Sequence, residues 1–268
     1  MDAHKTSLGF SEKRSLWARV ALAVLLVPAV VHLVGFAWML VMRAAYPMDL
    51  EWLEGAQLYQ AYRLAHGLQV YGPVDHGWMA LPYPPLQATI VGLLGRVLGV
   101  DYWVGRAVSD LALLSVMAIQ TLVLLRAAPS RRLGIALSIV AAAALDMVYP
   151  YLHGYMDFAR VDAVSFATVM LAAVLVDRPP TGKLGPFLQA FALTLTVYAK
   201  QNNVFFVFAL LALLTLRDWR RGLKVALVAG AASLALLGLL QWTSDGWFLS
   251  WMTTMRRHPI VLANGLPA

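Results

Sequence analysis

The chain has 268 residues, of which 60% are hydrophobic and only 13% are charged. Its apolar runs are long enough to cross the roughly 30 Å hydrocarbon core of a bilayer, which excludes an ordinary soluble domain and indicates a polytopic membrane protein. The net charge of +7 does not indicate nucleic acid binding, because the basic residues stand in short loops between apolar runs. The sequence contains no cysteine, which excludes disulfides and thiolate metal sites.

The apolar run at residues 16–42 predicts a first membrane helix. It is too long for a cleaved signal peptide, and further apolar segments follow it. Basic residues precede this helix and recur in the segments 126–132, 178–183 and 217–224. By the positive-inside rule, all four regions are expected to be cytoplasmic. We therefore expect an integral protein of the plasma or inner membrane with a cytoplasmic N-terminus.

Residues 44–104 are predicted to form one large outer loop. It carries two interfacial helices, at about 50–66 and about 85–99. The apolar piece at 87–100 contains Arg96 and is shorter than the roughly 20 residues that a membrane span requires. Counting it as a span would also place the basic segment 126–132 outside.

Six further spans are expected at residues 105–126, 132–150, 160–177, 184–199, 203–217 and 224–242. The fold class is thus an all-α polytopic membrane protein of about seven helices. We expect a tight hairpin at 199–203, because a continuous helix would bury Lys200 near mid-bilayer. Residues 1–242 would form one membrane module. Residues 243–268 would begin a second outer loop.

Three acids follow the first helix: Asp49, Glu51 and Glu54. In one interpretation Asp49 caps an interfacial helix that Gly67 ends, and the two glutamates are solvated acids of its first turn. In the other, a carboxylate acts as general base on an acceptor hydroxyl, with Asp49 the leading candidate. Glu51 and Glu54 would share a helix face, suited to orienting substrate or holding an ion. A divalent metal is possible but not required.

A second group of polar residues is predicted at the outer helix ends, where it would bind substrate: Tyr83, Asp157, Arg160, Asp162, Lys200, Gln201, Arg256, Arg257 and His258. We expect Lys200, Arg160 and His258 to converge on one anionic site, because these cations lie outside against the orientation rule. The alternative is that Arg160 and Asp162 merely hold two helices together.

Several short motifs occur in a characteristic order: the acidic motif, G-x-x-x-Y from Gly67, Y-P-P-L from Tyr83, R-V-D from Arg160, K-Q-N from Lys200 and D-G-W-F from Asp245. In this order the chain resembles the GT-C glycosyltransferases, nearest to the protein O-mannosyltransferase and aminoarabinose transferase branch (family 39-like).

The resemblance implies a seven-helix module with catalysis on the non-cytoplasmic face. Members of the family normally continue into further helices, so the resemblance also implies that this chain is a fragment or a minimal form. A sugar would pass, with inversion, from a polyprenyl-phosphate donor to a hydroxyl of a glycan, lipid or protein acceptor. Two alternatives are a transporter or lipid-flipping protein, and a catalytically inactive lipid-binding or assembly module. The transporter class needs polar groups near mid-bilayer in paired halves. Asp110, Gln120 and Asp146 are the only candidates, and they form no symmetric pair.

Overall fold

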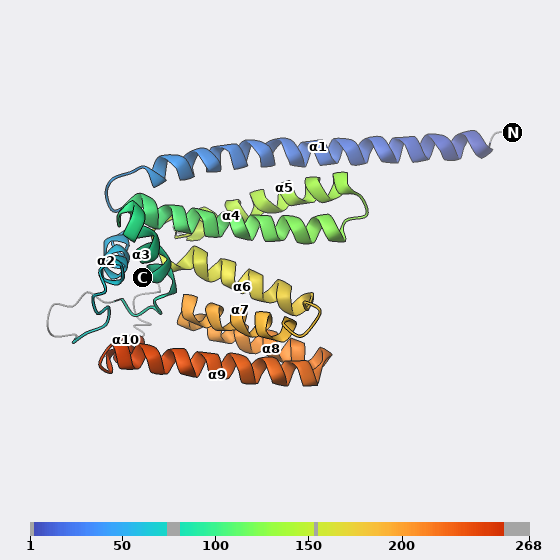
Figure 1. Cartoon of the computed structure of the whole chain (residues 1–268). Coiled ribbons are helices and arrows are strands. Elements are labelled where there is room, and N and C mark those ends of the chain that lie inside the picture. Colours follow the sequence, from blue (N-terminus) through green and yellow to red (C-terminus); the bar gives the residue numbers. More distant parts are fainter. Residues whose placement is uncertain (1–2, 74–80, 153–154, 255–268) are drawn as a thin grey trace, which may run out of the picture. The chain divides into compact units, whose positions relative to one another are not determined.

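The structure, a computed structural model, describes residues 3–73, 81–152 and 155–254. Within these ranges the chain is all-helical and contains no strand (Figure 1). Its helices are α1 (Ala3–Ala44), α2 (Glu54–Ala65), α3 (Leu86–Leu98), α4 (Tyr102–Ala127), α5 (Arg131–Met147), α6 (Val161–Asp177), α7 (Gly185–Ala199), α8 (Val204–Arg217), α9 (Trp219–Thr243) and α10 (Trp247–Thr254), with short 3₁₀ turns η1 (Tyr149–Leu152) and η2 (Gln201–Asn203).

The chain divides into two compact units. The first unit comprises residues 1–43 and 114–154, and therefore α1, the later part of α4, and α5. The second unit comprises residues 44–113 and 155–268, and its described helices are α2, α3, the start of α4, and α6 to α10.

Three of the described helices are long and apolar enough to cross a membrane: residues 20–44 of α1, α4 and α9. Helices α5 to α8 have 14 to 17 residues, below the roughly 20 that a span requires. The prediction of an all-helical fold is thus confirmed for the described residues, three of whose helices are candidate spans, and the count of seven spans is not established. Helix α3, with 13 residues, is too short to span, and its bounds match the predicted segment 85–99.

Helix α2 begins later than predicted, at Glu54. Leu53 occupies the position before it and makes no side-chain cap, so the expectation that Asp49 is its N-cap is wrong. The predicted end is confirmed. Gly67 has φ +67°, and the amides of Gly67 and Leu68 donate back to carbonyls of the last turn. Glycine adopts this left-handed backbone without the cost that a Cβ brings.

Helices α2 and α3 pack closely in the second unit, and Gly92 permits the contact. A Cβ at Gly92 would lie 2.7 Å from the Ala61 carbonyl oxygen. Ala61 and Val91 are buried at this crossing. The α2–α3 pair is therefore a fixed platform at whose two ends the candidate site residues lie.

The predicted hairpin between α7 and α8 is confirmed. Helix α7 ends at Ala199, and Lys200 is extended, with φ −159°. The Asn203 amide donates to the Thr196 carbonyl (2.9 Å) and to the Ser165 hydroxyl (2.8 Å), so it satisfies a polar group that the helix end leaves open. Helix α8 then returns toward the end of α6.

The two ends of the second unit differ in character. Arg217 pairs with Asp177 at 3.1 Å, and Arg221 donates to the Pro180 carbonyl at 2.9 Å. These contacts gather the basic segments 178–183 and 217–224 at one end of the helices. Lys200 and Asp162 meet at the other end, 2.7 Å apart.

Candidate functional site

A buried ion pair between Glu54 and Arg106 joins α2 to α4. The Arg106 Nε donates to Glu54 Oε1 at 2.9 Å, and Nη2 donates to Oε2 at 2.7 Å. Both residues are 0% exposed. Backbone amides complete the carboxylate: Leu50 N donates to Oε2 at 2.7 Å and Ala159 N to Oε1 at 2.9 Å. Each Glu54 oxygen thus accepts two hydrogen bonds.

Arg106 also holds the segment that precedes α2. Its Nη1 donates to the Tyr46 carbonyl (2.5 Å) and its Nη2 to the Met48 carbonyl (2.6 Å). These hydrogen bonds hold the backbone of residues 46–50, which includes Asp49, against α4. A buried guanidinium so fully bonded acts as a brace for this loop.

Burial by itself raises the pKa of the Glu54 carboxyl, but the hydrogen bonds from Arg106, Ala159 and Leu50 outweigh burial and lower this pKa below its ordinary value of 4.5. Glu54 is thus a carboxylate that is charged at neutral pH and has both oxygens occupied by hydrogen bonds. The interpretation of Glu54 as a solvated acid is wrong, because the pair with Arg106 buries it. The expectation that Glu51 and Glu54 share a helix face is also wrong, because α2 begins only at Glu54.

Asp49 differs from Glu54 in being exposed. Its Oδ1 accepts a hydrogen bond from Gly55 N at 2.9 Å, and the Tyr102 hydroxyl hydrogen-bonds to the same carboxylate. Both partners line a cavity of about 320 Å³ whose wall includes the aromatic rings of Tyr59, Tyr62 and Tyr102. An exposed carboxylate thus stands beside a tyrosine-rich hollow.

The remaining acid, Glu51, begins a chain of alternating charges that we call the outer network. Glu51 Oε2 lies 2.8 Å from Arg160 Nη1, and Arg160 Nε lies 3.2 Å from Asp162 Oδ2. Asp162 Oδ1 lies 2.7 Å from Lys200 Nζ. Arg160 and Lys200, two of the three cations that were predicted to converge, therefore both contact Asp162, and each is bound to a carboxylate. Their side chains are 7% and 27% exposed, respectively, so Lys200 is the more accessible cation.

Burial by itself would lower the pKa of Arg160. The hydrogen bond to Glu51 and the charges of Asp162 and Glu51 outweigh that effect and raise this pKa, with a further contribution from Tyr83. The guanidinium also stacks on the Tyr155 ring, 4.2 Å from its centroid. Arg160 thus remains charged and fixed in orientation.

The other predicted binding residues border this network. Tyr83 accepts a hydrogen bond from the Tyr71 hydroxyl through its carbonyl (2.7 Å), and the Gln201 amide donates to the neighbouring Pro82 carbonyl (2.8 Å). Asp157 is buried.

Three predicted cations lie outside the described residues: Arg256, Arg257 and His258. Among the residues that the structure describes, no three His, Asp or Glu side chains gather closely enough to hold a metal ion.

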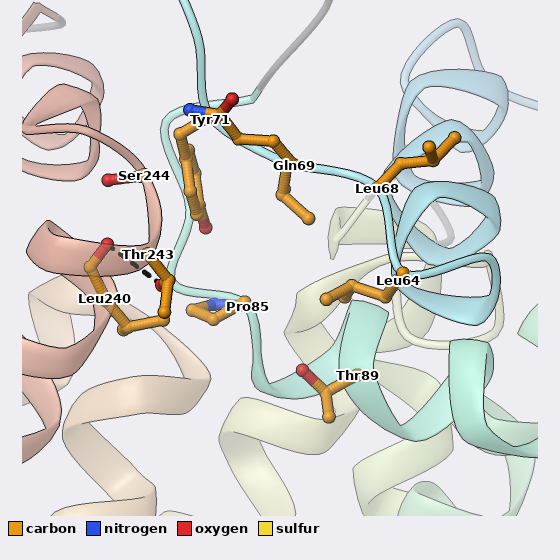
Figure 2. Close-up of a pocket in the computed structure, with 11 residues that line it drawn as sticks. Leu64, Leu68, Gln69, Tyr71, Pro85, Thr89, Leu240, Thr243 and Ser244 are labelled. Atoms are coloured by element: carbon orange, nitrogen blue, oxygen red, sulfur yellow. Dashed lines mark hydrogen bonds between the residues drawn. The ribbon is translucent and has the colours of Figure 1, made fainter.

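A second cavity, of about 400 Å³, lies where the end of α2, the start of α3 and the end of α9 meet (Figure 2). Its lining includes Gly67, Tyr71 and Pro85, which belong to two of the sequence motifs. Leu240 and Thr243 contribute the wall from α9, a candidate span. The cavity is lined mainly by apolar groups, with a few polar ones such as Thr89 and Ser244.

Arg106 was not anticipated from the sequence. The signal was present, because an arginine in the first turns of an apolar helix needs a partner.

Comparisons of this chain with protein-family models, curated proteins and solved structures found no match.

Proposed function

We propose that this chain is an inverting membrane glycosyltransferase that moves a sugar from a polyprenyl-phosphate donor to an acceptor hydroxyl. The observation that carries the proposal is Asp49, an exposed carboxylate beside a tyrosine-lined cavity, on a loop that a buried ion pair fixes. The motif order described above supports the same class.

Asp49 is the proposed general base. Glu54 accepts four hydrogen bonds and is buried, and Glu51 already binds Arg160 and the Leu53 amide. In the proposed step, Asp49 takes the proton of the acceptor hydroxyl while the oxygen of that hydroxyl attacks the anomeric carbon of the sugar. The bond from that carbon to the phosphate oxygen breaks, and the polyprenyl phosphate leaves with its electron pair.

The leaving phosphate needs a cation, and Lys200 is the candidate with the greatest exposure in the outer network. Its partner Asp162 is shared with Arg160, so the two cations face two carboxylates. The cavity between α2, α3 and α9 is the proposed place for the lipid end of the donor, because its wall includes the C-terminal end of α9, a candidate span.

We further propose that the outer network faces the non-cytoplasmic side and that the N-terminus is cytoplasmic. Within the second unit, the basic segments 178–183 and 217–224 lie at the opposite end from Lys200. The positive-inside rule assigns that basic end to the cytoplasm.

The test is sugar transfer from a labelled polyprenyl-phosphate sugar in membranes containing the full chain. Asp49→Asn keeps shape and hydrogen-bonding capacity but removes the proton acceptor, so turnover should fall about 10²–10⁴-fold. The matched control is Asp177→Asn, an exposed aspartate at the other end of the second unit, which should leave turnover unchanged. Near-normal turnover of a folded Asp49→Asn protein would exclude Asp49 as the base.

One observation favours a second candidate, a catalytically inactive lipid-binding or assembly module. In both charge clusters of the second unit, every carboxylate is bound to a cation: Glu54 to Arg106, Glu51 and Asp162 to Arg160, and Asp162 also to Lys200. Absence of transfer with any polyprenyl-phosphate sugar, together with retained binding of the donor lipid, would support this alternative.

A further inference from the structure

The end of the second unit at which α7 and α9 begin carries an excess of positive charge that the proposed sugar transfer does not use. Residues 177–185 and 217–224 hold six Lys and Arg side chains against two aspartates. Both aspartates are engaged, because Asp177 pairs with an arginine of each segment and Asp218 caps α9 by accepting a first-turn amide. Four cations of these segments form no ion pair with any described residue: Lys183, Arg220, Arg221 and Lys224.

Arg221 is held in a fixed orientation, but its charge is not neutralised. Its Nε donates to Gln189 Oε1 at 2.8 Å, and its Nη2 donates to the Pro180 carbonyl at 2.9 Å. Gln189 is itself buried, and its amide donates to the Leu175 carbonyl at 2.8 Å. Both partners of Arg221 are neutral oxygens, which orient a guanidinium without supplying a counter-charge. The remaining nitrogen, Nη1, is left to donate to an anion.

Two lysines stand beside Arg221 at the first turn of α7. A Cβ built on Gly185 would lie 2.8 Å from Arg221 Nη2, so glycine lets the guanidinium approach the backbone there. The exposed Lys183 comes two positions before this glycine. The Lys224 Nζ lies 5.1 Å from the centroid of the Phe187 ring, two positions after it. Lys183, Arg221 and Lys224 therefore form one cationic surface, which we call the α7–α9 patch.

Exposed apolar side chains continue from the α7–α9 patch along both helices. Arg221 contacts Gln189, and further along the Tyr198 hydroxyl donates to the Ser233 carbonyl at 2.7 Å, so α7 and α9 run side by side in the same direction (Figure 1). When the candidate span α9 crosses a bilayer, its first turn lies at the membrane surface. Three large apolar side chains then lie at the depth of the acyl chains, each 49–65% exposed: Leu188, Phe191 and Leu227.

A ligand that matches both parts of this surface has a phosphate group and hydrocarbon chains. A soluble phosphate would satisfy the cations and leave the apolar side chains without a partner. A zwitterionic lipid brings its own cation, which competes with the lysines. We propose that the α7–α9 patch binds the headgroup phosphate of an anionic phospholipid, whose acyl chains lie along the exposed apolar side chains of α7 and α9. The site is separate from the proposed sugar transfer, and its test needs no transferase activity.

The proposal is tested by photolabelling the purified full chain in phosphatidylcholine vesicles. The two probes are a phosphatidylglycerol and a phosphatidylcholine, each carrying a diazirine in an acyl chain and added in equal amount. Labelled segments are mapped by mass spectrometry. In the segments 187–191 and 219–227, labelling by the phosphatidylglycerol should exceed labelling by the phosphatidylcholine at least about tenfold, because each nearby Lys or Arg favours an anionic lipid about fivefold. The segment 234–240 of α9, away from the patch, should show no such preference.

Variants separate the α7–α9 patch from the net charge of the chain. Lys183→Gln and Lys224→Gln each remove an exposed lysine that forms no ion pair, and each should lower the preference for phosphatidylglycerol about fivefold. Arg132→Gln is the matched control, because it removes the same charge from an exposed position of the first unit. It should keep the preference of the parent.

Equal labelling by the two probes in the parent chain overturns the proposal, and this comparison needs no variant to fold. An equal fall in the Arg132→Gln control and the two lysine variants also overturns it, because the preference would then follow net charge alone. Loss of the phosphatidylglycerol labelling in millimolar inorganic phosphate would show that the patch takes a soluble anion and would likewise overturn the assignment to a lipid.

Discussion

The buried pair of Glu54 and Arg106 should make a large and measurable contribution to stability, and Glu54→Gln is the perturbation that isolates it. An amide can replace only one carboxylate oxygen as acceptor. Its NH₂ group would then face either Arg106 Nε and Ala159 N, or Arg106 Nη2 and Leu50 N, all of which are donors. The substitution therefore removes two hydrogen bonds and leaves a buried guanidinium without its counter-charge.

The size of the loss follows from these contacts. Hydrogen bonds to charged groups contribute about 1.5–3 kcal/mol each, so two of them amount to roughly 3–6 kcal/mol. The range of about 3–5 kcal/mol for breaking a buried pair from one side agrees with this sum. For a chain of this size, 1 kcal/mol shifts the Tm by roughly 2–4 °C, so a fall on the order of 10 °C or more is expected.

The assay is thermal unfolding of the full chain in detergent, followed by the fraction that stays monodisperse after heating. Asp177→Asn is the control, because it breaks an exposed pair with Arg217 whose worth is about 0–1 kcal/mol. A Glu54→Gln protein that unfolds within about 2 °C of the parent would refute the reasoning, because the pair would then not brace the 46–50 loop.

The pKa of Glu54 is lower in the folded protein than in the unfolded chain, so the stabilisation by its charged form is fully present above the unfolded-state pKa. This stabilisation is lost as the pH falls below about 4. In that pH range the Tm of the parent protein should therefore drop more than the Tm of the Glu54→Gln protein. Gly92→Val should destabilise the folded protein by about 1–3 kcal/mol, because the added side chain overpacks the α2–α3 contact. The control Gly230→Ala, in open space on α9, should be neutral or slightly stabilising. Equal Tm values for the two variants would contradict the close α2–α3 contact. Single cysteines at Ser130 and Thr243 should react with a membrane-impermeant thiol reagent from opposite sides, and labelling of both from the same side would overturn the proposed topology.

Much of the fold was predictable from the sequence because hydrophobicity is a local property. The break at Lys200, the short helix α3 and the helix end at Gly67 were all located correctly. Each follows from a cost that the residue itself carries: a lysine in hydrocarbon, too few residues to span, or a left-handed backbone that suits glycine.

The error in the α2 start shows the limit of the same reasoning. Asp49 is a residue type that caps helices, but which of several nearby acids binds the first turn depends on where the loop is held. Arg106, 52 positions away from Glu54, holds that loop through the Tyr46 and Met48 carbonyls. The sequence indicates that Arg106 needs a partner, but no local pattern indicates which residue that partner is.

The sequence by itself therefore determined the all-helical class, most of the helix positions and most of the polar residues of the candidate site. The tertiary structure alone decided their states: Glu54 buried and paired, Asp49 exposed beside tyrosines, and Arg160 and Lys200 converging on Asp162. The physical reason is that the charge state and accessibility of a side chain depend on which distant groups fold against it, because desolvation and ion pairing act through space, whereas helix formation and membrane partition depend mainly on neighbours along the chain.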